Sequence, residues 1–310
     1  MRGIAVMVAI SIMIMVLISC QLLGGGGGGG ILPPIGGGGG SGGGGIVRGS
    51  GNIANDFGSL LGKDIDGDGD VDSAVLMDQI HNDIYVGRSI LVSNTGVYVA
   101  GNGDNVWGYV LKLDYNGNVV NNFGGITIGN GAPQVQGMVT FQNIVGRNFG
   151  VDAAEDVYVS GGSVYVVGYS AYDYTNTAGV VIKMDENNGT LDSNFGTNGV
   201  KLIDDVDGTE VYDMCRAVYV EGSNMYVAID SGGYGGYLYV KKLDAGNGNE
   251  IGSSPKLDKI WPVGGIGDKV EIEDSGDGNI IVGITGYNSS TDYIYITKLD
   301  GSSLVKLYEK

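Results

Sequence analysis

Residues Val97–Asp114 read VYVAGNGDNVWGYVLKLD: an apolar and aromatic run, a polar loop, and a second run that ends in a Lys-Leu-Asp turn. Runs rich in Val, Ile and Tyr that are bounded by Gly, Asn and Asp are typical of two strands joined by a loop. Three related stretches follow at Val164–Asp185, Met225–Asp244 and Ile280–Asp300. Their closing aspartates lie 71, 59 and 56 residues apart. Self-similarity at this spacing predicts a repeat architecture.

Further strand-like segments flank these stretches, so that each repeat divides into four strands. First strands are expected at Ser89–Ser93, Asp156–Gly161, Arg216–Gly222 and Lys269–Asp274, and fourth strands at Asn118–Gly125, Thr190–Val200, Glu250–Ile260 and Ser303–Lys310. No segment after residue 50 has the i, i+3, i+4, i+7 apolar spacing of a helix. The pattern predicts an all-β fold, a β-propeller of four four-stranded antiparallel blades. Five blades are the alternative, because residues 126–155 hold additional strand-like pieces.

A Phe-Gly motif follows the Lys-x-Asp turn in two repeats. It reads DSNFGTNG at Asp192–Gly199 and NNFGG at Asn121–Gly125, whereas the last two repeats lack it. Together with VYVxG and KLD, this pattern resembles the bacterial extracellular β-propeller repeat of the delta-sixty type. The same Phe-Gly pair stands early, at Asn55–Gly58. The resemblance implies a ring closed by an N-terminal strand, which completes the last blade or pairs beside it and so removes an open sheet edge.

Charge and glycine are unevenly distributed along the chain. Of 60 glycines, 17 lie between Gly24 and Gly49. Residues 1–50 contain no acidic side chain, so residues 51–310 carry a net charge of −20 within an overall −18. A body of this charge repels nucleic acid, which excludes a nucleic-acid-binding function. These shifts divide the chain into a signal segment (1–20), a glycine-rich flexible tether (21–50) and a propeller domain (51–310).

The N-terminal segment MRGIAVMVAISIMIMVLISC has the charged start and apolar run of an export signal. Its end, Leu17-Ile18-Ser19-Cys20, resembles a bacterial lipobox. The resemblance implies cleavage before Cys20 and a lipid on that cysteine, which would anchor the protein at the outer membrane, the cell surface or the periplasmic side. An uncleaved membrane anchor and a plain secretory signal are the alternatives. Cys215 then has no disulfide partner, and we expect it to be a small buried residue.

The densest acidic motif is DIDGDGDVD, at Asp64–Asp72. Hard divalent cations prefer several carboxylate oxygens, which alternate positions of a tight loop bring to one centre. The nine-residue spacing resembles the calcium loop of FG-GAP-type propeller blades, and an EF-hand would need an acid where Val75 stands. We expect a structural Ca²⁺, with Asp64, Asp66, Asp68 and Asp72 as side-chain ligands and the carbonyl of Asp70. The alternative is a solvated acidic turn.

Aromatic residues stand in the stretches expected to be loops between second and third strands. In a propeller these loops emerge on one face, called the loop face here. Aromatic rings among polar side chains suit glycan or protein ligands, because rings supply contact area at low entropy cost. The alternative is that each ring packs on its own blade. The candidate ligand-binding residues are Trp107, Tyr172, Tyr174, Tyr234 and Tyr287.

Catalytic signatures are sparse. His81 is the sole histidine, and no G-x-S-x-G elbow between a strand and a helix is recognisable. A glycosidase needs only two carboxylates, and with 35 acidic residues no pair can be selected by spacing. The sequence therefore predicts a non-enzymatic, monomeric binding or scaffold protein. The alternative is a polysaccharide-active enzyme that uses a carboxylate pair.

Overall fold

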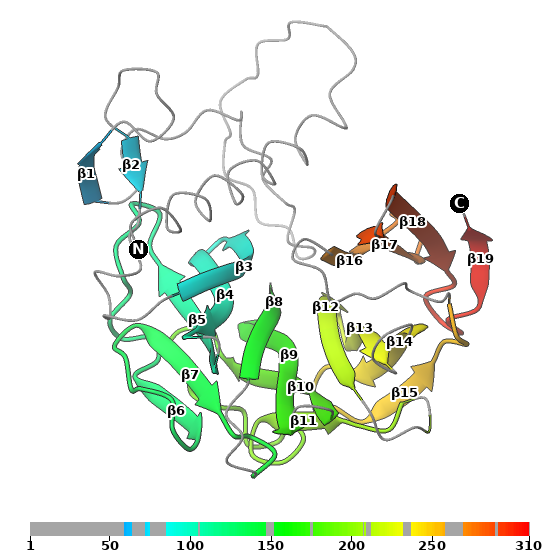
Figure 1. The fold of residues 1–310 in the computed structure, drawn as a ribbon, viewed down its shortest axis with the longest axis horizontal. Helices are drawn as coiled ribbons and strands as arrows, with labels where there is room; N and C mark the ends of the chain where they lie inside the picture. Colours follow the sequence, from blue (N-terminus) through cyan, green and yellow to red (C-terminus); the bar gives the residue numbers. More distant parts are fainter. Residues whose placement is uncertain are drawn as a thin grey trace, which may run out of the picture.

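The computed structural model describes residues 59–63, 72–74, 85–104, 106–146, 152–173, 176–206, 208, 212–231, 237–257, 269–288 and 291–309. Every regular element within these ranges is a β-strand (Figure 1), so the predicted all-β class is confirmed. No helix in the described part of the chain is long and apolar enough to cross a membrane.

Four large sheets contain most of the strands. The first has the order β3-β4-β5-β7-β6, and its strands are antiparallel except for β6, which runs parallel to β7. Its bounds are β3 (Tyr85–Ser93), β4 (Gly96–Gly103), β5 (Trp107–Leu113), β6 (Ile126–Gly129) and β7 (Met138–Gln142). The second sheet is antiparallel, with β8 (Asp152–Ser160), β9 (Ser163–Asp173), β10 (Asn176–Asp185) and β11 (Val200–Ile203) in chain order.

The third and fourth sheets repeat the antiparallel four-strand order. The third consists of β12 (Asp213–Glu221), β13 (Asn224–Ser231), β14 (Tyr237–Asp244) and β15 (Glu250–Ser253). The fourth consists of β16 (Lys269–Asp274), β17 (Ile280–Asn288), β18 (Thr291–Leu299) and β19 (Lys306–Glu309). The predicted strand–loop–strand stretches are therefore the second and third strands of the four sheets.

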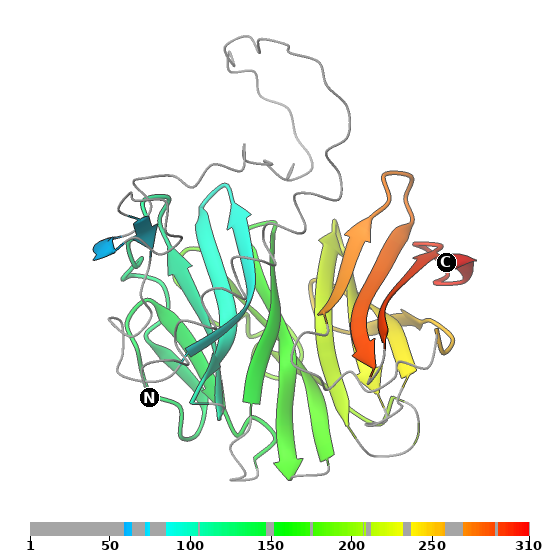
Figure 2. The ribbon, with the colours of Figure 1, turned by 45° about the horizontal axis from the view of Figure 1, so that its top comes forward.

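The first strand of each sheet lies innermost. β8 packs against β3 and β12, and β12 packs against β16. Figures 1 and 2 show the four sheets fanning outward from these inner strands, with the short fourth strands at the periphery. The arrangement is β-propeller-like, and we call the line that the inner strands surround the axis.

The fourth strands differ most from prediction. Residues 118–125 form turns with isolated bridges, and β7 takes the place beside β5 instead. In the second sheet only Val200 of the predicted strand is in β11. In the first sheet an Asx turn explains why the outer strand starts later than predicted. The Asp114 carboxylate accepts the backbone N–H groups of Asn116 and Asn118 and holds the chain in a turn. The pieces that suggested a fifth blade are β6, β7 and the start of β8.

The N-terminal part of the domain contributes one small sheet to the described structure. β1 (Ser59–Lys63) pairs with β2 (Asp72–Ala74). The fourth-strand place in the last sheet is occupied by β19, so the N-terminal strand does not fill it. Pairing of an N-terminal strand beside that sheet stays a prediction.

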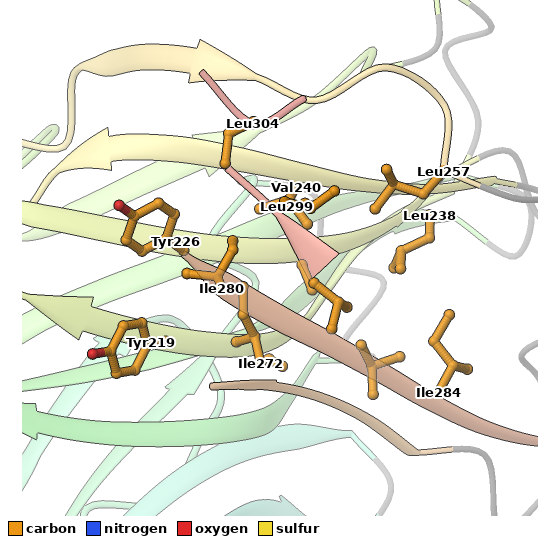
Figure 3. Packing of buried hydrophobic residues seen from close by; sticks show 14 residues of the cluster. Tyr219, Tyr226, Leu238, Val240, Leu257, Ile272, Ile280, Ile284, Leu299 and Leu304 are labelled. Carbon is orange, nitrogen blue, oxygen red and sulfur yellow. The ribbon is translucent and has the colours of Figure 1, made fainter. Parts of the chain in front are cut away.

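Apolar side chains fill the spaces between neighbouring sheets. Figure 3 shows the cluster between the third and fourth sheets, where Tyr226 and Val240 pack with Ile272 and Leu299. Equivalent clusters join the first sheet to the second and the second to the third. The core is thus divided into layers, each shared by two consecutive sheets.

A tyrosine and a lysine of each of the first three sheets also reach the turn of the next sheet. These are the Tyr of VYV or MYV and the Lys of the Lys-x-Asp turn, and the lysine lies over the tyrosine ring, with its Nζ 5.2–5.7 Å from the centroid. We call each pair a clasp, because both side chains donate to backbone carbonyls across the boundary. Tyr98 and Lys112 donate to the carbonyl of Glu186. Tyr165 donates to that of Ala245 and Lys183 to that of Gly246, and Tyr226 and Lys242 both donate to that of Gly301.

The fourth sheet lacks this clasp. Ile281 stands at the tyrosine position and is 36% exposed, and Lys298 pairs with Asp277 at 2.6 Å. Ile296 aligns with the buried Val240 but is 42% exposed. The face that packs on a following sheet in three cases is therefore solvent-exposed at these positions of the fourth.

Candidate functional site

Three inner strands carry a β-bulge at the same place. The register shifts skip Arg88 in β3, Glu155 in β8 and Arg216 in β12. A bulge adds an unpaired residue that bends the strand and redirects its side chain, and bulges are frequent beside functional sites. Here they bring the three side chains together at the axis.

These side chains form a network of ion pairs. Glu155 Oε1 lies 3.3 Å from Arg88 Nη1 and 3.5 Å from Arg216 Nη1, and Arg216 Nη2 lies 3.2 Å from Asp230 Oδ2. Arg88 Nε also donates to Asn102 Oδ1 at 2.9 Å. Burial disfavours the charged guanidinium of Arg216, but Glu155 and Asp230 outweigh it and raise its pKa. We call Arg88, Glu155, Arg216 and Asp230 the axial cluster.

Asp156, the next residue along β8, ties three sheets together. Its carboxylate accepts from Ser89 Oγ of the first sheet at 2.6 Å, from its neighbour Val157 N at 2.8 Å and from Val218 N of the third sheet at 2.9 Å. Burial, and then the charge of Glu271, raise the pKa of Asp156 to about 6. Both carboxylate oxygens are thus engaged in holding the inner strands.

The fourth sheet completes the cluster from its inner edge. Lys269 Nζ lies 2.9 Å from Glu271 Oε1 and donates to the Arg88 carbonyl at 3.5 Å. The side chains of Arg88 and Lys269 are 34% and 35% exposed, whereas Glu155 is 9% exposed. Asn102 and Asp230 lie next to the last residues of β4 and β13, so the cluster is near the end of the sheets where the loops leave.

Among the described residues, seven buried side-chain polar atoms make no hydrogen bond, and Glu155 Oε1 of the cluster is one of them. Glu155 Oε1 is buried and accepts no hydrogen bond in the described part of the chain, although two arginines lie within 3.5 Å. Buried acceptors are satisfied in most native proteins, so an unsatisfied one beside the partly exposed Arg88 is a candidate contact for a donor of a ligand.

The predicted ligand-binding aromatics are placed differently. Trp107 is not in a loop but is the first residue of β5, 3% exposed, and packs edge-on against Tyr85 at 5.5 Å. The alternative of packing on its own blade therefore holds for Trp107. Tyr172 lies in β9, and its hydroxyl donates to Asp204 Oδ2 at 2.9 Å. The backbone of Tyr287 is in β17, while Tyr174 and Tyr234 lie outside the described residues.

The lipidation and calcium predictions fall largely outside the described ranges. Cys20 and the residues Asp64, Asp66, Asp68 and Asp70 lie outside them, and Asp72 is described only through its backbone in β2. No group of three or more His, Cys, Asp or Glu able to hold a metal occurs among the residues that are described. Cys215 is buried as expected, and burial raises the pKa of its thiol.

A hollow of about 350 Å³ lies beside the turn that follows β10, and Asp185 and Asp192 contribute to its lining. Asp185 Oδ1 accepts the backbone N–H groups of Asn187 and Asn188. Asp192 pairs with Lys183 at 2.8 Å, and this contact lowers the pKa of its carboxyl. Hydrolysis by two carboxylates needs one acid of raised pKa, and Asp192 is the opposite.

Sequence reasoning did not find the axial cluster, although a signal for it exists. Aligned on their first strands, the repeats read YVGRSILV from Tyr85, DAAEDVYV from Asp152 and DMCRAVYV from Asp213. The fourth position is charged in all three, just before an apolar run. A charged residue at a fixed place in the innermost strand would have indicated a site on the axis.

Comparison with known proteins gives distant structural likenesses only. No family model and no curated protein matches the chain. An endo-arabinase from Bacteroides thetaiotaomicron is similar at 14% identity and a TM-score of 0.39, covering 72% of this chain and 80% of that one. BamB from Moraxella catarrhalis is similar at 9% identity and a TM-score of 0.32, covering 73% and 62%. At these TM-scores neither likeness carries an argument about function.

Proposed function

We propose that the protein is an exported, membrane-anchored lipoprotein whose four-bladed propeller acts as a ligand-binding module. The observation that carries the binding role is the axial cluster, where three sheets each supply a charged side chain from a bulge. Its buried ion pairs fix the orientation of Arg88 and Glu155 before any ligand arrives, and a preorganised site binds with a lower entropy cost. The loop face then receives the ligand.

Binding is favoured over hydrolysis because the carboxylates near the axis are engaged. Glu155 lies between two arginines, Asp230 pairs with Arg216, and Asp156 accepts three hydrogen bonds. A carboxylate-pair hydrolase remains the second candidate, and the raised pKa of Asp156, about 6, is the observation that favours it.

Screening of the full chain against a glycan array and by pull-down tests the binding role. We expect retention of a defined ligand class, which substitution of Arg88 by alanine weakens. Turnover of a polysaccharide, abolished by Asp156→Asn in a variant that circular dichroism shows to be folded, would instead establish the hydrolase.

The membrane anchor is proposed to be a lipid on Cys20. Cys20→Ala would remove the sulfur that carries the lipid, so we expect the protein to leave the membrane fraction. Fractionation followed by immunoblotting measures this, with Cys215→Ala as the control that keeps the anchor. Unchanged membrane association of the Cys20 variant would contradict the proposal.

A structural Ca²⁺ is proposed to bind Asp64, Asp66, Asp68, the Asp70 carbonyl and Asp72. A cation that binds only the folded state stabilises it by mass action, so we expect EDTA to lower the melting temperature and excess Ca²⁺ to restore it. The variant Asp66→Asn with Asp68→Asn should melt at the EDTA value in either condition. A melting temperature that does not respond to EDTA would count against the site.

Ring closure is proposed to involve an N-terminal strand beside the fourth sheet. The exposed Ile281 and Ile296 on that sheet, and Ile90 and Val92 on β3, support it. These positions correspond to buried or partly buried ones at the other boundaries, so an apolar element covering them would extend the pattern of layers.

A further inference from the structure

We infer that the axial cluster, together with Lys269, binds a sugar carboxylate, that of a terminal uronate residue of an acidic polysaccharide, with Arg88 and Lys269 holding the carboxylate and Glu155 holding an adjacent hydroxyl. The inference rests on the proposed binding function and names its ligand class.

The cationic half of the site consists of Arg88 and Lys269. Both side chains are about one-third exposed, and the Lys269 ammonium of the fourth sheet reaches the backbone of Arg88 in the first sheet, where it donates to the Arg88 carbonyl. Arg88 is held by Asn102 through Nε and by Glu155 through Nη1, and its Nη2 makes no hydrogen bond in the described part of the chain. A fixed guanidinium with an open Nη2 suits a carboxylate oxygen, to which it can donate a charge-assisted hydrogen bond.

The carboxylate can reach Lys269 at little cost. The present partner of Lys269 is Glu271, which is 55% exposed, and ion pairs between solvent-exposed side chains contribute little to stability. Asp230 and Glu155, in contrast, are engaged with the more buried Arg216. An incoming anion would therefore replace Glu271 at the surface and leave the buried pairs intact.

The acceptor half of the site is Glu155. Its Oε1 is buried without a hydrogen-bond donor, and it lies 3.3 Å from the same Arg88 that would hold the carboxylate. A ligand that satisfies both groups must present a donor next to its carboxylate. A uronate at the non-reducing end of a chain does so, because its free C4 hydroxyl is on the carbon next to the one that carries the carboxylate, whereas the side chains of acidic peptides have only methylene groups there. The overall charge of −18 opposes polyanions in general, so binding depends on this local pair of cations.

The experiment compares oligogalacturonate with its methyl ester, which keeps the sugar and removes the charge. We expect the full chain in detergent to bind the acid more tightly than the ester by calorimetry, with an affinity that falls as salt increases. Lys269→Met and Arg88→Ala should each weaken binding of the acid roughly tenfold or more, because each removes a charged hydrogen-bond donor.

Lys298→Met is the matched control, since Lys298 lies in the same sheet and pairs with an exposed carboxylate, that of Asp277. It should leave the affinity unchanged, and circular dichroism should show that all variants are folded. Equal affinity for acid and ester, or equal losses for the Lys269 and Lys298 variants, would overturn the inference. The same would follow if galacturonate, glucuronate and mannuronate oligomers all failed to bind. Binding of a neutral glycan or a protein in those cases would leave the proposed binding function standing.

Discussion

Arg216→Met is expected to lower the free energy of unfolding by about 3–5 kcal/mol, the usual cost of removing one partner from a buried ion pair. Arg216 lies 3.5 Å from Glu155 and 3.2 Å from Asp230, and these two side chains are only 9% and 10% exposed. Without the guanidinium, Asp230 would lose its ion pair with Arg216, and of its two arginines Glu155 would keep Arg88. Urea denaturation followed by circular dichroism measures the change.

Lys241→Met is the control in the same sheet. Its partner Glu250 is 44% exposed, so the loss should stay within about 1 kcal/mol. Similar losses for the two variants would mean that solvent already reaches the axial cluster. A second variant, Glu155→Gln, keeps the shape of the side chain and should recover part of the stability of Arg216→Met by removing a buried negative charge that has lost one of its two arginines.

Phe195→Ala is expected to cost about 3–5 kcal/mol as well, because it opens a cavity between two sheets. Phe195 is fully buried, and its ring meets Tyr165 edge-on at 6.4 Å. Gly248, in the turn of the third sheet at φ +76°, abuts the ring so closely that a Cβ there would lie 3.1 Å from it. The phenylalanine thus fills the space beneath a clasp.

Leu202→Ala is the matched control for Phe195→Ala, since Leu202 is in β11 of the same sheet but 39% exposed. Its loss should stay near 0.5 kcal/mol, roughly the limit for most surface substitutions. A Phe195 variant that unfolds at the same urea concentration as the Leu202 variant would show that the boundary between the two sheets can close over the gap.

The repeated stretches of the sequence predicted the second and third strands well. VYVAG and KLD each combine an apolar run with turn residues, so pattern and propensity agree at the same place. The Asx turns after Asp114, Asp185, Asp244 and Asp300 recur in the structure for the same reason, because each carboxylate accepts nearby backbone N–H groups.

The outer strands and the axial cluster could not be placed from the pattern. A fourth strand such as β11 has only four residues, too few for a clear pattern of alternating apolar and polar side chains. Its position depends on where the preceding turn ends. Bulges leave no mark on hydrophobic alternation, so the charged position that Arg88 and Glu155 share, 67 residues apart, becomes visible only when the repeats are aligned on their first strands. Trp107 misled the prediction because its flanking glycine and asparagine resemble a loop, while the ring belongs to the core.

The clasps make each sheet depend on the one that follows it. The hydroxyl of Tyr226 and the ammonium of Lys242 are satisfied only when the Gly301 turn of the fourth sheet is formed. Because every sheet contacts mainly its neighbours, stability in such a row is a sum of local terms and couplings between adjacent units, as in repeat proteins. The fourth sheet accepts the clasp of the third and has no clasp of its own. We therefore expect amide hydrogen exchange to be fastest in the fourth sheet and unfolding to start there.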